Sequence, residues 1–353
     1  MVGAFSHHNP LGWPDGLRAR LLRLLGSVGV QLVRSPELRV AVRGSVAILV
    51  ALAGSLCVPL WILAVGPLFL GVPHLLADVR YLVARPGHQR SLKLAVGVGL
   101  PLVICGLGAG MPAGLLALLG ALLLGEGRTL RKVIGVGLVL LVAATWFVDR
   151  SFYVHELLLA HLHNPIGVLL WFLWRPRHER LHFIPLGLYL ACVLLLGLGL
   201  VGPLGQALLR WPDPTVDALD YLRDALAPGL SEALGTRLLL LYCFAQMVHY
   251  SVWLQLVPDE DRDRPTPRTF RQSLVALRDD LSGPLLIAAG LLLIGFVVWS
   301  FFSVWDARVA YFRLAAFHGY LELCALGLWF VAGHVPRPVR PLRLSKHGLL
   351  PTM

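Results

Sequence analysis

Residues 284–305 read PLLIAAGLLLIGFVVWSFFSVW and contain no Asp, Glu, Lys or Arg. Residues 181–204, LHFIPLGLYLACVLLLGLGLVGPL, are free of the same four residue types. A helix needs about 20 mostly apolar residues to cross the hydrocarbon core of a bilayer, and both stretches reach that length. A membrane β-barrel would instead show short strands of alternating polarity, so the sequence predicts an all-α membrane protein.

The composition of the chain agrees with this prediction. Of its 353 residues, 57% are hydrophobic and only 14% are charged, and the mean hydropathy is +0.71. Soluble domains carry about a quarter charged residues, so these values exclude an ordinary soluble protein. All five cysteines lie in apolar stretches without a CxxC pair, which argues against a disulfide framework or a thiolate metal site.

Hydropathy predicts about ten membrane spans, with both termini in the cytoplasm. The predicted spans are residues 40–57, 60–83, 93–110, 112–125, 133–148, 152–174, 182–204, 237–257, 284–304 and 309–333. This arrangement places 25 of the 31 Lys and Arg residues in cytoplasmic segments. Because cytoplasmic loops of membrane proteins are rich in Lys and Arg, the net charge of +11 indicates topology and not nucleic-acid binding.

The chain divides into three predicted segments. Residues 1–39 form a cytoplasmic segment, in which the Arg- and Leu-rich stretch 16–33 has the spacing of an amphipathic helix at the lipid surface. Residues 40–333 form the transmembrane domain, and residues 334–353 form a basic cytoplasmic tail. Residues 259–283 are the longest internal cytoplasmic loop, either a solvated connector or a lid. We expect an integral protein of a bacterial inner membrane, in contact with membrane lipids.

Histidines carry the candidate chemistry. Apart from His182, which lies at the interface end of its span, six of the 13 histidines fall inside predicted spans, where an ionisable group normally faces the bundle interior and serves a function. At a rise of about 1.5 Å per residue, five of them lie near one depth and the sixth roughly 12 Å farther out. The five are His74, His161, His163, His249 and His318, and the sixth is His155. We expect His74, His163, His249 and His318 to converge around one metal site, with His161 and His155 completing or flanking it.

Three carboxylates accompany these histidines as candidate catalytic or metal-orienting groups. Asp78 follows His74 by four residues, and Glu322 follows His318 by four, so each carboxylate shares a helix face with its histidine. Glu156 belongs to the segment HELLLAHLHNP, residues 155–165, in which the final proline predicts a kink.

Imidazole and carboxylate ligands without thiolates favour non-haem iron, as one ion or two, with copper or zinc as alternatives. A site at mid-membrane is reached from the bilayer, so we expect an oxidoreductase acting on a hydrophobic small molecule such as an isoprenoid, a carotenoid or an acyl chain. Tyr250 and Trp253, which follow His249, are expected to line the substrate pocket together with Tyr320.

Two other classes of function use the same residues. A haem-b electron carrier would bind haem between two axial histidines, either His74 with His249 or His163 with His318. A proton or metal-ion transporter would use His, Asp and Glu side chains as a relay across the membrane.

One motif resembles a known family. Gly71-Val72-Pro73-His74, followed by Asp78, resembles the Gly-x-Pro-His-Gly-x-x-Asp element of the Brp/Blh β-carotene dioxygenases, with Leu75 in place of the second glycine. The resemblance implies a polytopic membrane enzyme in which histidine-bound iron cleaves β-carotene to retinal. It implies that His74 is an iron ligand, with further ligands among the histidines of the sixth, eighth and tenth spans.

Overall fold

The structure is a computed structural model that describes residues 12–149, 152–174, 180–201, 216–261 and 266–336. Within these ranges every regular element is a helix and none is a strand, which confirms the predicted all-helical class. The α-helices are α1 (Trp13–Leu24), α2 (Gly26–Arg34), α3 (Pro36–Cys57), α4 (Pro59–Asp78), α5 (Leu92–Leu94), α6 (Leu100–Ile104), α7 (Gly110–Leu124), α8 (Thr129–Asp149), α9 (Phe152–Leu173), α10 (Phe183–Gly197), α12 (Val216–Leu226), α13 (Glu232–Ser251), α14 (Val257–Glu260), α15 (Phe270–Leu281), α16 (Gly283–Ser300) and α17 (Val304–Ala332). Short π-helices continue several of them, namely η1 (Val79–Ala84), η3 (Ala95–Gly99), η4 (Cys105–Ala109) and η6 (Val252–Leu256), and η2 (His88–Arg90) and η5 (Arg180–His182) are 3₁₀ turns.

Seven helical segments of the described chain are long and apolar enough to cross a membrane. They are Pro36–Cys57, Pro59–Ala84, Leu92–Leu124, Arg180–Gly197, Glu232–Glu260, Gly283–Ser300 and Val304–Ala332. The third segment covers two of the predicted spans, 93–110 and 112–125. The backbone bends where they meet, at Gly108, whose φ of 114° a residue with a side chain rarely adopts. The count of ten spans stays a prediction.

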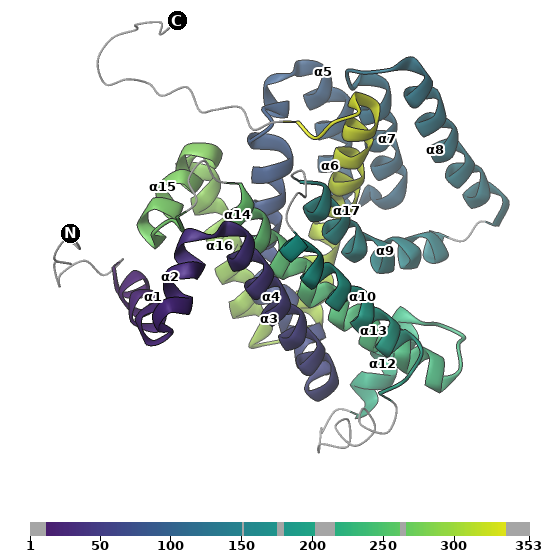
Figure 1. The fold of residues 1–353 in the computed structure, drawn as a ribbon. Helices are drawn as coiled ribbons and strands as arrows, with labels where there is room; N and C mark the ends of the chain where they lie inside the picture. The colour runs from purple at the N-terminus through teal and green to yellow at the C-terminus, as the bar shows by residue number, and fades with distance from the viewer. Residues whose placement is uncertain (1–11, 150–151, 175–179, 202–215, 262–265, 337–353) are drawn as a thin grey trace, which may run out of the picture.

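The helices pack around α13 and α17. Figure 1 shows α5–α8 gathered on one side of α17, and α3, α10 and α13 on the other. Of an 18-residue apolar stretch within Glu232–Glu260, 72% of the residues are buried, against 6% for the 18 residues of Gly283–Ser300. Helix α13 is therefore interior, while most of α16 is left for lipid. An interior helix is where buried polar side chains can meet side chains from several neighbours.

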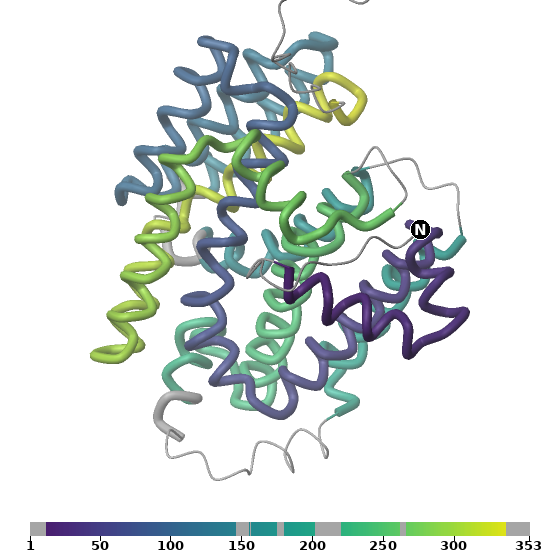
Figure 2. Tube along the Cα trace, turned by 90° about the vertical axis from the view of Figure 1, so that its left-hand side faces the viewer, coloured from purple at the N-terminus to yellow at the C-terminus, as the bar shows by residue number. Residues whose placement is uncertain are grey.

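The amphipathic stretch at residues 16–33 is two helices and not one, because Gly26 adopts a φ of 56° between α1 and α2. Figure 2 shows this pair beside the bundle, at the end away from α5–α8. It is attached to α15, whose first backbone N–H, that of Phe270, donates to the Asp15 carboxylate at 2.9 Å. Helix α15 lies within residues 259–283, which the sequence predicts as a loop. It begins at a capping box formed by Thr269 and Gln272.

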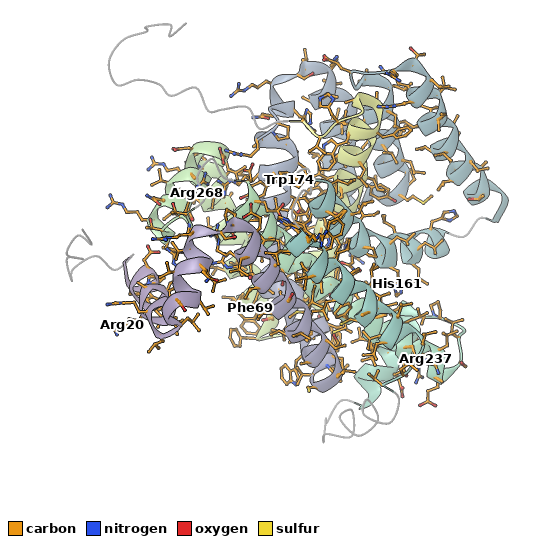
Figure 3. All side chains as sticks on the ribbon, viewed as in Figure 1. Arg20, Phe69, His161, Trp174, Arg237 and Arg268 are labelled. Atoms are coloured by element: carbon orange, nitrogen blue, oxygen red, sulfur yellow. The ribbon has the colours of Figure 1, made fainter. Side chains whose placement is uncertain are left out.

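Ion pairs tie this end of the molecule together. Arg39 Nε donates to Asp259 Oδ2 at 2.7 Å, and Arg80 Nε donates to Asp280 Oδ2 at 2.8 Å. In Figure 3, Arg20 and Arg268 lie on the side that carries α1, α2 and α15, whereas Arg237 lies near α12 at the opposite end.

Candidate metal centre

Four imidazole rings meet inside the bundle, each from a different helix. His74 is on α4, His163 on α9, His249 on α13 and His318 on α17. The ring centroids are separated by 4.7 Å for His74 and His249, 5.0 Å for His74 and His318, 5.2 Å for His163 and His249, and 5.0 Å for His163 and His318. These are the four histidines that the sequence predicts to converge, out of the five that it places near one depth, and the structure brings them together.

The local backbone around these residues is irregular. The helix of α4 changes to the π form at Val79, directly after Asp78, and the helix of α13 changes at Val252, three residues after His249. Single π turns within α-helices occur frequently at functional sites, since they turn the side chains that precede them. On α9, Gly167 leaves the space that His249 occupies, because a Cβ atom there would lie 2.4 Å from His249 Nδ1.

The nitrogen and oxygen atoms within the cluster lie close to the spacing of ligands of one ion. Nε2 of His74 lies 2.8 Å from Nε2 of His249 and 3.2 Å from Asp78 Oδ2, and His249 Nε2 lies 3.5 Å from Glu322 Oε1. Ligands held about 2.1 Å from an ion, at angles of 90–109°, lie about 3.0–3.4 Å apart.

The ligand atoms form two overlapping groups. Within each group, all the atoms lie within 4.8 Å of one another. One group is His74, His249 and His318, and the other is His74, Asp78 and Glu322. His163 belongs to neither group, although its ring adjoins those of His249 and His318. Six donors from four helices could therefore surround one ion directly and reach a second.

The two carboxylates are buried and lack compensation by protein cations. Asp78 and Glu322 are both 0% exposed, and among the described residues their ion-pair partners are histidines alone. Neither oxygen of Asp78 has a hydrogen-bond partner in the described chain, and Glu322 Oε2 also lacks one. A buried unpaired carboxylate costs several kcal/mol, so a cation between these groups would offset a large penalty.

Hydrogen bonds from the far side of the rings orient three of the histidines. Nδ1 of His163 contacts Leu159 O at 3.2 Å, Nδ1 of His249 contacts Asn164 O at 3.4 Å, and Nδ1 of His318 contacts Ala315 O. An imidazole that donates Nδ1–H to a carbonyl carries its lone pair on Nε2, which is the arrangement of metal-bound histidines. The tautomer that these contacts favour is thus the ligating one.

Trp253 and Asn164 have roles that the sequence did not predict. Trp253 Nε1 donates to Glu322 Oε1 at 2.7 Å and so fixes a carboxylate. Its place in a substrate pocket stays a prediction. Asn164 is fully buried next to His163 and supplies the carbonyl for His249. Tyr250 lies 5.2 Å from the His74 ring and accepts a hydrogen bond from Gln246 Nε2.

Two predicted metal ligands lie outside the cluster. Nε2 of His161 bonds Leu226 O at 2.9 Å, because His161 is about 200° around the helix from His163. His155 lies more than two helical turns from His163, and its Nε2 is 3.2 Å from Thr145 Oγ1. Of the two roles that the sequence allows them, completing the site or flanking it, these positions match the flanking one. Glu156 is on α9, but its side chain lies outside the described part of the structure.

A cavity of about 550 Å³ and a second of about 480 Å³ flank the cluster. The larger lies under α15 and reaches Trp253 and Ala77. The smaller lies among η4, α7, α9, α12, α13 and α17, and reaches His163, His318 and Tyr320. Two of the clustered imidazoles line the smaller one directly, and it is termed the histidine cavity below.

Comparison with known proteins supplies no relative. The chain matches no protein-family model, no curated protein and no solved structure.

Proposed function

We propose that this protein is an intramembrane metalloenzyme, a non-haem iron oxygenase or oxidase acting on a lipid-soluble substrate. One observation carries the proposal: four imidazoles and two buried carboxylates, aimed at one another from four helices, adjoin a largely apolar cavity. A donor set of nitrogen and carboxylate oxygen without thiolate suits iron, and copper or zinc remain alternatives. Two carboxylates would balance the charge of one divalent ion or half that of two.

The distances disfavour a haem bound between His74 and His249. Two axial nitrogens on opposite sides of an iron are about 4 Å apart, if each bond is about 2.0–2.1 Å. Nε2 of His74 and Nε2 of His249 are only 2.8 Å apart, and Asp78 contacts the same nitrogen of His74. A porphyrin ring has no room between these two side chains.

The chain itself would perform three tasks in such a reaction. His74, His249 and His318 would hold the ion, with Asp78 and Glu322 as ligands or as acceptors that balance its charge. When bound, iron would supply the activation of oxygen. Tight packing around His74 and His249, which are 0% and 1% exposed, would keep water away from one side of the site. The substrate would approach from the other side, where His163 and His318 face the histidine cavity.

A substrate-dependent reaction with oxygen tests this function. Iron-loaded protein in lipid nanodiscs is incubated with β-carotene, other isoprenoids and acyl lipids, while oxygen uptake and product masses are recorded. We expect one of these classes to stimulate oxygen uptake and yield an oxidised product. Stoichiometric iron with no uptake on any class would contradict an oxygenase and favour a transporter, to be tested by proton or metal flux into vesicles.

We also propose ten spans, with both termini in the cytoplasm of a bacterial inner membrane. The grouping of Arg20 and Arg268 with α1, α2 and α15 supports this orientation, since basic residues are retained on the cytoplasmic side. A topology reporter fused after Gly229 should report the outside, and one fused after Thr266 should report the cytoplasm. Equal reports from both fusions would rule out α13 as a span.

A further inference from the structure

Arg308 is a buried cation in the wall of the histidine cavity. It lies in the first turns of α17 and is 9% exposed. No carboxylate of the described residues forms an ion pair with it, in contrast to Arg39 and Arg80, which have Asp259 and Asp280. The guanidinium keeps its charge in proteins, so burial without a counter-ion is costly.

Backbone and ring contacts hold Arg308 in place without using all its donors. Its Nε donates to Leu63 O at 2.9 Å, and that carbonyl is available because Pro67, four residues later, has no N–H. The guanidinium carbon lies 4.7 Å from the Phe312 ring and 5.9 Å from the Trp305 ring. Among the described residues, no side chain or carbonyl accepts a hydrogen bond from the two terminal nitrogens.

The cavity is polar at one end and apolar toward the cluster. Ten residues of α17 separate Arg308 from His318, which is about 15 Å along a helix. Between them the lining is largely apolar and includes Met111, Leu159 and Phe312. The exposed Arg313 adds a second positive charge to the same lining. An elongated molecule with one charged end would match this distribution.

We propose that the histidine cavity binds an amphiphile whose single anionic head group, a carboxylate or a phosphate, pairs with Arg308. Its apolar chain extends along α17 toward His163 and His318. A planar guanidinium binds either anion through two parallel hydrogen bonds, which would use the free nitrogens of Arg308. This inference rests on the proposed function only in taking the histidine cavity as the substrate site. It narrows the substrate class from hydrophobes in general to anionic amphiphiles.

Equilibrium binding of matched lipids to the holoprotein tests the pairing. Oleic acid, lysophosphatidate and oleyl alcohol are titrated into protein in a non-ionic detergent, and binding is followed by calorimetry. We expect an anionic lipid to bind at least about tenfold more tightly than the alcohol. The alcohol cannot form the charge-assisted hydrogen bond to the buried guanidinium, and the loss of that bond lowers its affinity by about this factor. The better of the two anions identifies the head group. Equal affinities for all three lipids would overturn the proposal.

Variants assign the effect to one residue. Arg308→Gln should remove the preference for the anion and leave the affinity for oleyl alcohol unchanged, whereas Arg308→Lys should retain part of the preference. Arg237→Gln is the control, because Arg237 is an exposed arginine of α13 outside the cavity. Thermal unfolding and metal content identify a variant that misfolds through loss of the Leu63 contact. In that case the ratio of the wild-type affinities for oleic acid and oleyl alcohol alone decides whether the proposal holds. An undiminished preference in folded Arg308→Gln would overturn the proposal.

The outcome is independent of turnover. His249→Ala, with a disrupted metal cluster, should still prefer the anion, since Arg308 and the apolar lining are unchanged. In the iron-loaded wild type, anion binding without oxygen uptake would refute the proposed oxygenase and leave the amphiphile site standing.

Discussion

Replacing His249 by alanine is expected to lower the metal affinity by more than about 100-fold, beyond the 10–100-fold typical of outer-sphere partners. His249 Nε2 lies within 3.5 Å of both His74 Nε2 and Glu322 Oε1, so its removal opens one side of the ligand set. Metal content after purification, measured by mass spectrometry for each variant at equal protein concentration, gives the result directly.

His161→Ala is the matched control for this substitution. His161 has nearly the same predicted depth as His249, but its ring nitrogen bonds Leu226 O and lies outside the cluster. It should keep the metal content of the wild type. Full metal content in His249→Ala, or an equal loss in His161→Ala, would show that the cluster is not the metal site.

Replacing Glu322 by glutamine should have opposite effects on the metal-bound and metal-free states. With metal, the loss of one negative charge should reduce affinity by about 10–100-fold. Without metal, Glu322 Oε2 has no hydrogen-bond partner among the described residues, so removing the charge should leave the melting temperature unchanged or raise it. Thermal unfolding of both states, with chelator-treated protein as the metal-free sample, separates the two effects.

Asp259→Asn gives the contrasting case. Asp259 is also buried, but it accepts a hydrogen bond from Arg39 at 2.7 Å. Removing one partner of a buried pair costs about 3–5 kcal/mol, so both states should be destabilised equally. If Glu322→Gln behaved like Asp259→Asn in the metal-free state, Glu322 would be a structural ion-pair residue and not a metal-associated one.

The sequence predicted the convergence of the histidines because depth in a membrane can be read from hydropathy. A helix that spans a bilayer fixes the height of each residue, so His74, His163, His249 and His318 had to lie near one plane. The helical phase also predicts that His161 faces away from the cluster, because it is about 200° around the helix from His163. Depth alone had grouped the two.

Other features depend on tertiary contacts that hydropathy does not contain. The proximity of Gly167 to His249, and the bond from Trp253 to Glu322, require knowledge of which helices are neighbours. Helix α15 was taken as a loop because its sequence is too polar for a span, although Thr269 and Gln272 have the spacing of a capping box. Arg308 was overlooked because an arginine near a span end is normally solvated.

The metal content and optical spectrum of the purified wild-type protein test the central claim most directly. We expect one or two iron ions per chain, no Soret band, and loss of the iron in the double variant His74→Ala, His249→Ala. Absence of bound metal from protein that was purified without chelator, or a Soret band in place of non-haem iron, would contradict the proposed centre.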